Sequence, residues 1–132
     1  ACGRLSRADN GRWFFGLPGN PVSALVTFVQ LVRPALERLM GQITTEPLRL
    51  QALSESPLRL SAGRIDFQRG IVRSDARGQL FVSSAGGQGS AMFTSLSQAN
   101  CLIRLDPTCY PGEERLPAGS WVTIELFDEV LR

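Results

Sequence analysis

The hydrophobic pattern of this 132-residue chain changes its period once, near residue 45. Over residues 21–40, apolar side chains recur at intervals of three and four, which predicts one long amphipathic helix with Gly41 as the residue that ends it. Pro34 lies inside this stretch and has no N–H to donate, so we expect a kink or a break there. Beyond residue 47, short alternating runs separated by glycine and proline are typical of an all-β unit.

Short strands are expected throughout the second part of the chain, and Asp75 to Gly78 has the composition of a hairpin turn. Residues 106–118 contain three prolines and are expected to form an exposed loop. The predicted strands cover residues 48–53, 64–74, 79–83, 101–105 and 121–126. Such a series favours a small barrel or a compact sandwich, because closure removes exposed strand edges.

An apolar run at residues 13–15 precedes the helix and is typical of a strand covered on both faces in a parallel sheet. The loop that follows ends at Asn20 and Pro21, which suit the N-cap and the first helical position. The unpaired N–H groups of the first helical turn, with the Ser23 hydroxyl, form a terminus that suits an anion. On spacing alone, an ordinary strand-to-helix turn is the alternative.

Composition excludes several classes of function. Fourteen basic and twelve acidic residues give a net charge of +2, which is too small to argue for nucleic acid or an anionic membrane. The absence of histidine excludes a Ser-His-Asp triad and a His-containing zinc site within the chain. No apolar run is long enough to cross a membrane, and from the polar N-terminal stretch we expect no secretory leader. The three cysteines, Cys2, Cys101 and Cys109, fit free thiols in a reducing, cytoplasmic setting.

Two positions in the β part carry groups that suit an anion. Arg69 offers a planar guanidinium fork, and the neighbouring Gly70 would leave room for close approach. Gln88 and Ser90 lie among glycines in a loop whose exposed N–H groups could form an anion-binding nest. A solvated arginine and a plain connecting loop are the alternatives. Asp66 shares a strand face with Gln68 and not with Arg69, so we assign it no acid–base role.

Three stretches resemble the molybdopterin molybdenumtransferases of the MoeA and gephyrin family, in the family's order. The resemblance covers nearly the whole chain but only the C-terminal part of the family's protein. It implies a mainly β chain with one long N-terminal helix. Residues 1–44 would be the last strand and helix of an α/β molybdopterin-binding domain, and residues 45–132 a small β-barrel domain. The matching stretches are residues 16–24 (GLPGNPVSA), 63–70 (GRIDFQRG) and 87–90 (GQGS), the last followed by Ser95, Asn100 and Cys101.

The resemblance implies an activity in molybdenum cofactor biosynthesis. In the family, molybdate supplies molybdenum to the dithiolene of adenylylated molybdopterin in a magnesium-dependent step. The pocket lies between the subunits of a homodimer, where the barrel of one chain faces the α/β domain of the other. The implied catalytic residues are Ser23, Arg69 and Ser90, and the implied cofactor-binding residues are Pro18, Gly19, Asn20, Pro21 and Gln88.

These groups suit a tetrahedral dianion held by electrostatics, and we assign no general acid or base and no metal ligand in this chain. Some family members carry histidine within the stretch that corresponds to residues 86–91, which here has none. The family's acidic metal-binding residues also have no counterpart, so we expect the 132-residue chain alone to be inactive.

Two other classes of function compete with this interpretation. The barrel could be a protein-interaction or dimerisation module without a catalytic role, for example by adding a peptide strand to an exposed edge. It could also be a nucleic-acid-binding barrel of the OB or SH3 type, which requires a basic stripe with interleaved aromatic residues. The arginines of this chain are scattered among acidic residues, so the nucleic-acid interpretation ranks last.

Overall fold

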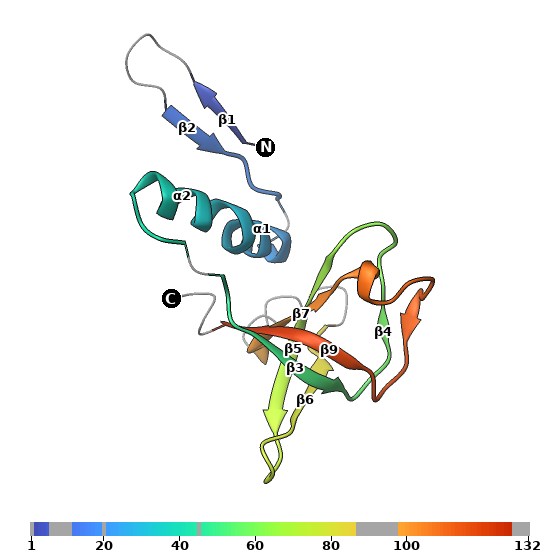
Figure 1. The fold of residues 1–132 in the computed structure, drawn as a ribbon. Coiled ribbons are helices and arrows are strands. Elements are labelled where there is room, and N and C mark those ends of the chain that lie inside the picture. Colours follow the sequence, from blue (N-terminus) through green and yellow to red (C-terminus); the bar gives the residue numbers. More distant parts are fainter. Residues whose placement is uncertain (1, 6–11, 20, 45, 87–97, 128–132) are drawn as a thin grey trace. The chain divides into compact units, whose positions relative to one another are not determined.

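The chain divides into two compact units, Ala1–Glu46 and Pro47–Arg132. The computed structural model describes residues 2–5, 12–19, 21–44, 46–86 and 98–127 (Figure 1). The first unit contains a strand ladder and a helical segment, and the second contains the barrel. The expected fold class, mainly β with one long N-terminal helix and a small barrel, is confirmed.

The first unit begins with an antiparallel ladder of β1 (Cys2–Leu5) and β2 (Arg12–Phe15). The sequence predicted a strand at β2, but in a parallel sheet that covers both of its faces. Within the described residues, β2 pairs with β1 in antiparallel register, and Trp13 and Phe14 are 49% and 44% exposed. The parallel sheet of a complete α/β domain stays a prediction. The apolar run predicted the strand but not its partner, because β1 is short and contains a glycine and an arginine.

One continuous helical segment follows, made of α1 (Pro21–Thr27), the π-helical η1 (Phe28–Val32) and α2 (Arg33–Leu39). The N–H of Arg33 donates to the carbonyl of Phe28, five residues earlier. This wider turn lies directly before Pro34, which cannot supply the usual hydrogen bond to the carbonyl four residues earlier. The interruption expected at Pro34 therefore takes the form of a π-helical turn within a continuous helix.

The helix ends as the sequence predicted. Gly41 has a φ of 75°, in the left-handed region that glycine tolerates best. Its N–H donates to the carbonyl of Arg38 at 3.0 Å, and the N–H of Gln42 donates to the carbonyl of Glu37 at 2.8 Å. These two bonds make a Schellman motif, which satisfies carbonyls that the helix itself leaves unpaired.

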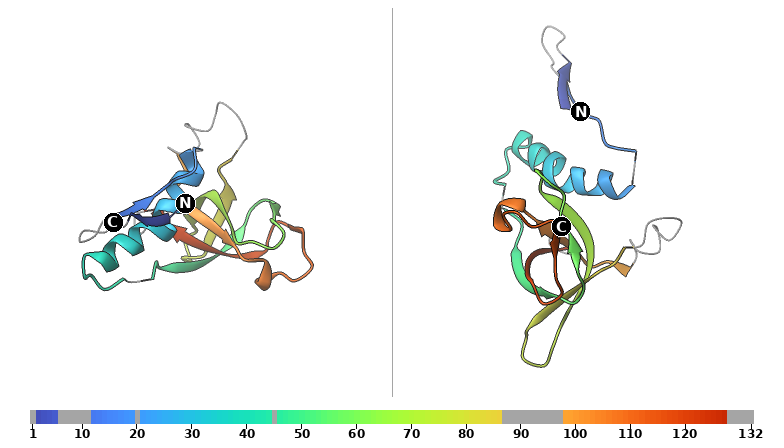
Figure 2. Two further views of the ribbon diagram at one scale, coloured as in Figure 1. Left: turned by 90° about the horizontal axis from the view of Figure 1, so that it is seen from above. Right: turned by 90° about the vertical axis from the view of Figure 1, so that its right-hand side faces the viewer.

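The second unit is built around a closed five-stranded barrel (Figure 2). Around the barrel, β3 pairs with β6 in parallel, and every other neighbouring pair is antiparallel. The strands, in order around the barrel, are β3 (Arg49–Ser54), β6 (Leu80–Ser84), β5 (Asp66–Ser74), β7 (Cys101–Leu105) and β9 (Trp121–Leu126). The prediction of a small closed barrel is confirmed.

A second, two-stranded ladder lies outside the barrel pairing. It joins β4 (Leu58–Arg59) to β8 (Arg115–Leu116) in antiparallel register. The 3-10 helix η2 (Pro107–Cys109) lies in the same connection as β8. The sequence predicted only an exposed loop there, because two-residue strands are too short to show a period.

Alternation along each strand separates an inner face from an outer face. On β7, Cys101, Ile103 and Leu105 are fully buried in the barrel core, while Leu102 and Arg104 belong to the outer face. The other buried members of the core cluster are Ala52, Leu58, Leu60, Val82, Leu116, Val122 and Ile124. This assignment of faces fixes where each candidate site residue on β5 points.

Candidate functional site

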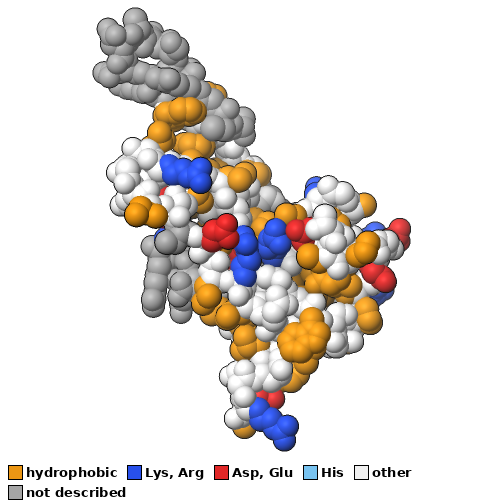
Figure 3. Space-filling model, in the orientation of Figure 1, with side chains coloured by type: hydrophobic (Ala, Val, Ile, Leu, Met, Phe, Trp, Pro, Cys, Tyr) orange, Lys and Arg blue, Asp and Glu red, His pale blue; other side chains and the backbone are white. Residues whose placement is uncertain are grey.

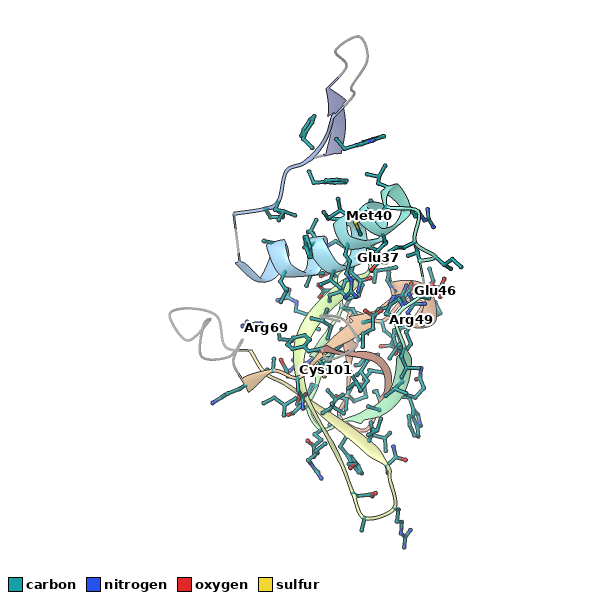
Figure 4. The ribbon with its side chains drawn as sticks, turned by 90° about the vertical axis from the view of Figure 1, so that its left-hand side faces the viewer. Glu37, Met40, Glu46, Arg49, Arg69 and Cys101 are labelled. Atoms are coloured by element: carbon teal, nitrogen blue, oxygen red, sulfur yellow. The ribbon has the colours of Figure 1, made fainter. Side chains whose placement is uncertain are left out.

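Arg69 lies on the outer face of the barrel. In register it is opposite Leu102 of β7, and its neighbour Gly70 is opposite the core residue Cys101. Because successive residues of a strand point to opposite faces, Arg69 must point away from the core. Figure 4 shows the Arg69 side chain directed away from the barrel interior, where Cys101 lies.

Both ends of the connection between β6 and β7 meet β5 beside Arg69. The N–H of Ala85 donates to the Arg69 carbonyl at 2.9 Å, and the N–H of Asn100 donates to the Gly70 carbonyl at 3.1 Å. A Cβ added to Gly86 would lie 3.5 Å from Nη2 of Arg69, so the guanidinium lies against this glycine. Arg69 therefore lies beside both ends of the glycine-rich connection for which the sequence predicted an anion-binding nest.

The side chain of Asn100 extends this arrangement along β5. It accepts from the N–H of Val72 at 2.7 Å and donates to the Val72 carbonyl at 3.0 Å. The pairing of β7 with β5 stops at Cys101 opposite Gly70, so the asparagine amide replaces a backbone partner beyond that point. Asn100 lies in one of the stretches that resemble the family, but the sequence predicted no role for it.

Gly70 has a different role from the one predicted. A Cβ at this position would lie 2.8 Å from Cγ1 of Ile103 and 2.9 Å from both Sγ of Cys101 and Cγ2 of Val82. The glycine therefore makes room for the packed core and not for a ligand beside Arg69. The expectation was wrong because sequence alone did not show which face of β5 is inside.

Asp66 lies where the alternation placed it. Nε2 of Gln68 donates to Oδ2 of Asp66 at 3.0 Å and to the carbonyl of Arg59 at 2.7 Å. Asp66 and Gln68 therefore share a face, as predicted, and Arg69 lies on the other face of the strand.

The candidate residues from the N-terminal stretch belong to the first unit. Pro18 and Gly19 are exposed in the loop between β2 and α1, and a Cβ on Gly19 would meet nothing within 4 Å. Pro21 begins α1, and Ser23 is exposed in its first turn. Arg69 belongs to the second unit. Asn20, Gln88 and Ser90 lie outside the described residues, so their roles remain predictions.

A charged pair on the outer face was not foreseen. Glu125 of β9 is fully buried, and its Oε1 lies 3.3 Å from Nε of Arg49 on β3. Register places Arg69, Leu102, Glu125 and Arg49 in one row across four strands. Glu125 occupies an outward position in an ordinary alternating run, so nothing in the sequence indicated its burial.

Cys101 is unsuited to nucleophilic or metal chemistry at neutral pH. Burial in the core raises the pKa of its thiol to about 12, so the thiolate is not available. Among the residues that the structure describes, no three His, Cys, Asp or Glu side chains are grouped so that they could hold a metal ion. In the same part of the chain, no helix has the length and apolarity needed to span a membrane.

The fold and its site define a small closed β-barrel with an outward arginine at the base of a glycine-rich connection, preceded by a helical unit. The sequence model of the family described as "MoeA C-terminal region (domain IV)" matches residues 51–127. The chain belongs to this family, which confirms the resemblance seen in its sequence.

Curated relatives extend the match beyond the barrel. The chain is 44% identical to the molybdopterin molybdenumtransferase of Haemophilus influenzae, over 99% of this chain and 31% of the relative. It is 36% identical to molybdopterin molybdenumtransferase 1 of Mycobacterium tuberculosis, over 92% of this chain and 28% of the relative. The chain thus spans less than a third of the length of these relatives.

A solved structure agrees in fold. The crystal structure of the molybdopterin biosynthesis moeA protein from Pyrococcus horikoshii matches with a TM-score of 0.60 and 22% identity. The match covers 82% of this chain and 26% of the archaeal chain. At this identity, the likeness supports the fold alone.

Proposed function

We propose that this chain is the C-terminal part of a molybdopterin molybdenumtransferase and supplies one wall of its substrate pocket. The complete enzyme would insert molybdenum from molybdate into the dithiolene of adenylylated molybdopterin. The observation that carries the proposal is the 44% identity, across 99% of this chain, to a relative with that name. The barrel wall of the pocket would be centred on Arg69.

The surroundings of Arg69 support an electrostatic role. Its guanidinium is on the outer face of the barrel, against a glycine that adds no side chain above it. A planar fork of N–H donors suits bidentate contact with a tetrahedral oxyanion such as molybdate. Donors fixed in place before the reaction stabilise charge without reorganising, so Arg69 would hold the oxyanion while its oxygen ligands leave.

The remaining pocket residues would come from two further segments. In this proposal, Ser90 and Gln88 donate from the connection that follows Gly86. Pro18, Gly19, Asn20, Pro21 and Ser23 border the pocket from the α/β side, which a second subunit of a homodimer provides. The exposure of Ser23 in the first turn of α1 is compatible with a donor at this border.

Magnesium, which the family implies, is not matched by the side chains that the structure describes. None of the Asp, Glu and Cys side chains in that part of the chain form a group of three around a possible ion. A magnesium site in the complete enzyme would therefore need ligands from elsewhere. No step assigned to Arg69, Ser23 or Ser90 depends on the ion.

The decisive experiment measures molybdate-dependent turnover of adenylylated molybdopterin by the complete transferase that contains this chain. We expect Arg69→Ala and Ser90→Ala each to lower turnover by about 100-fold, which is typical for the loss of one preorganised donor. Arg77→Ala is the matched control, because Arg77 is an exposed arginine in the hairpin turn after β5. It should leave turnover unchanged.

Unchanged turnover in both Arg69→Ala and Ser90→Ala, with the dimer intact, would contradict the proposal. The barrel would then be better explained as an interaction or dimerisation module. Strand addition to the barrel is disfavoured in any case, because each of its five strands already has a partner on both sides. The 132-residue chain by itself should show no molybdenum insertion.

A further inference from the structure

The register of the β4–β8 ladder places two arginines directly opposite each other. In its two-residue register, Leu58 is opposite Leu116 and Arg59 is opposite Arg115. The leucines are buried in the core, so the arginines, which are exposed, lie on the other face of the ladder. The Cβ atoms of directly opposite residues in an antiparallel ladder lie about 5 Å apart, and like charges on such residues are destabilising.

No salt bridge to a described carboxylate offsets this repulsion. Arg59, Arg115, Glu114 and Pro57 line a hollow of about 430 Å³. Arg59 also lines an adjoining hollow of about 690 Å³, together with Arg64. Glu113 and Glu114 border this second hollow. Yet within the described part of the chain, no carboxylate oxygen lies within 4.0 Å of a guanidinium nitrogen of these three arginines.

We propose that the Arg59–Arg115 pair binds a tetrahedral oxyanion dianion of the phosphate, sulfate or molybdate type. Two guanidinium forks on neighbouring strands can each donate to a different pair of oxygens of one tetrahedral ion. A single carboxylate has only two oxygens and satisfies one fork. Arg64, at the adjoining hollow, is a third donor for the same ion.

The two glutamates limit what the site accepts. Three guanidinium groups against two carboxylates leave one net positive charge around the hollows. A single dianion gains from the arginines, whereas an extended polyanion such as nucleic acid would also meet the glutamates. The site therefore selects a small oxyanion.

This site is separate from Arg69. The carbonyl of Arg59 accepts from Gln68, whose side chain lies on the opposite face of β5 from Arg69. Arg69 lines neither of the two hollows, so the two proposed oxyanion sites can be distinguished by mutation. The inference does not depend on the proposed function.

The test is the thermal stability of the 132-residue chain in chloride and in inorganic phosphate, at the same pH and ionic strength. Phosphate at roughly ten times its Kd should raise Tm by about 5 °C. Arg59→Gln and Arg115→Gln should each abolish this rise. In chloride, the same variants should melt no lower than the wild-type chain, because each removes the repulsion. Arg77→Gln, in the exposed hairpin turn, should keep the full response to phosphate.

Further arms distinguish ion binding at the Arg59–Arg115 pair from binding at Arg69 and from a general salt effect. Sulfate and molybdate should reproduce the phosphate effect, and acetate should not. Arg69→Gln should keep the response. A response lost in Arg69→Gln but kept in Arg59→Gln would overturn the inference and assign the ion to the Arg69 site. An equal rise of Tm in all variants would indicate only a general salt effect and would also overturn the inference. No rise of Tm in the wild-type chain would overturn it too.

Discussion

Adjacent residues of β5 serve different purposes in this domain. Arg69 faces outward beside Gly86, while Gly70 faces inward against Cys101 and Ile103. The glycine is required by the core, since any larger side chain must displace atoms that are already in contact. The arginine contributes its guanidinium to the outer surface. A change at either position should therefore affect a different property of the protein.

Replacing Gly70 with alanine should destabilise the barrel without a direct effect on the Arg69 surface. The new Cβ would lie within 2.9 Å of three side chains of the packed core, and such overpacking costs about 1–3 kcal/mol. The free energy of unfolding, measured by urea denaturation, should fall by this amount. Gly86→Ala is the control, because its Cβ would make only an ordinary contact at 3.5 Å. Equal stability of both variants would contradict the assignment of Gly70 to the core.

The two described cysteines should differ sharply in reactivity. Burial raises the pKa of the Cys101 thiol to about 12, whereas Cys109 is exposed. Alkylation of the folded chain at pH 8, read by peptide mass spectrometry, should modify Cys109 and leave Cys101 intact until the protein is denatured. Modification of Cys101 at the rate of Cys109 would show that the barrel core is open.

The same pKa shift predicts a direction for the pH dependence of stability. A thiol whose pKa is raised on folding stabilises the protein fully below its unfolded pKa, which is about 8.5. That contribution is lost as the pH rises from there toward the folded value of about 12. The free energy of unfolding should therefore fall above pH 9 more steeply in the wild-type chain than in Cys101→Ala.

At the scale of the elements, Asn100 secures the junction between β5 and β7. Its side chain pairs with both backbone groups of Val72 beyond the point where the β7 ladder ends. Asn100→Ala should lower the free energy of unfolding by about 1–3 kcal/mol, because it removes two hydrogen bonds. It should also speed hydrogen exchange at the Val72 amide. Gln51→Ala, which removes only the side-chain bond to Thr123, should cost less and leave Val72 protected.

Sequence patterns predicted the longer strands but not the shortest ones. The strands at Cys101–Leu105 and Trp121–Leu126 begin and end where predicted, because the first is a short, mostly apolar run and the second alternates. The ladder of β4 and β8 was missed, since two residues show no period. The outward direction of Arg69 could be inferred by alternation once the core residues were known. The burial of Glu125 could not, because it depends on what packs over the outer face.

At the scale of the molecule, the two units differ in how well they bury apolar side chains. The continuous core cluster belongs to the barrel unit. In the first unit, Trp13, Leu31, Leu39 and Met40 are each about half exposed or more, and Figure 3 shows such side chains at its surface. A 46-residue segment of this kind is close to the size below which a hydrophobic core alone rarely suffices.

The barrel unit should therefore fold without the first unit. A chain of residues 47–132 should give dispersed amide signals by NMR and one cooperative thermal transition, because its core and all five strand pairings lie within it. A peptide of residues 1–46 should melt without a cooperative transition, since ordering its backbone costs more than its small buried area returns. Circular dichroism on both pieces checks the two expectations together. If residues 47–132 proved disordered alone, the barrel would depend on the first unit for stability, and Arg69 variants could then be interpreted only in a protein that contains both.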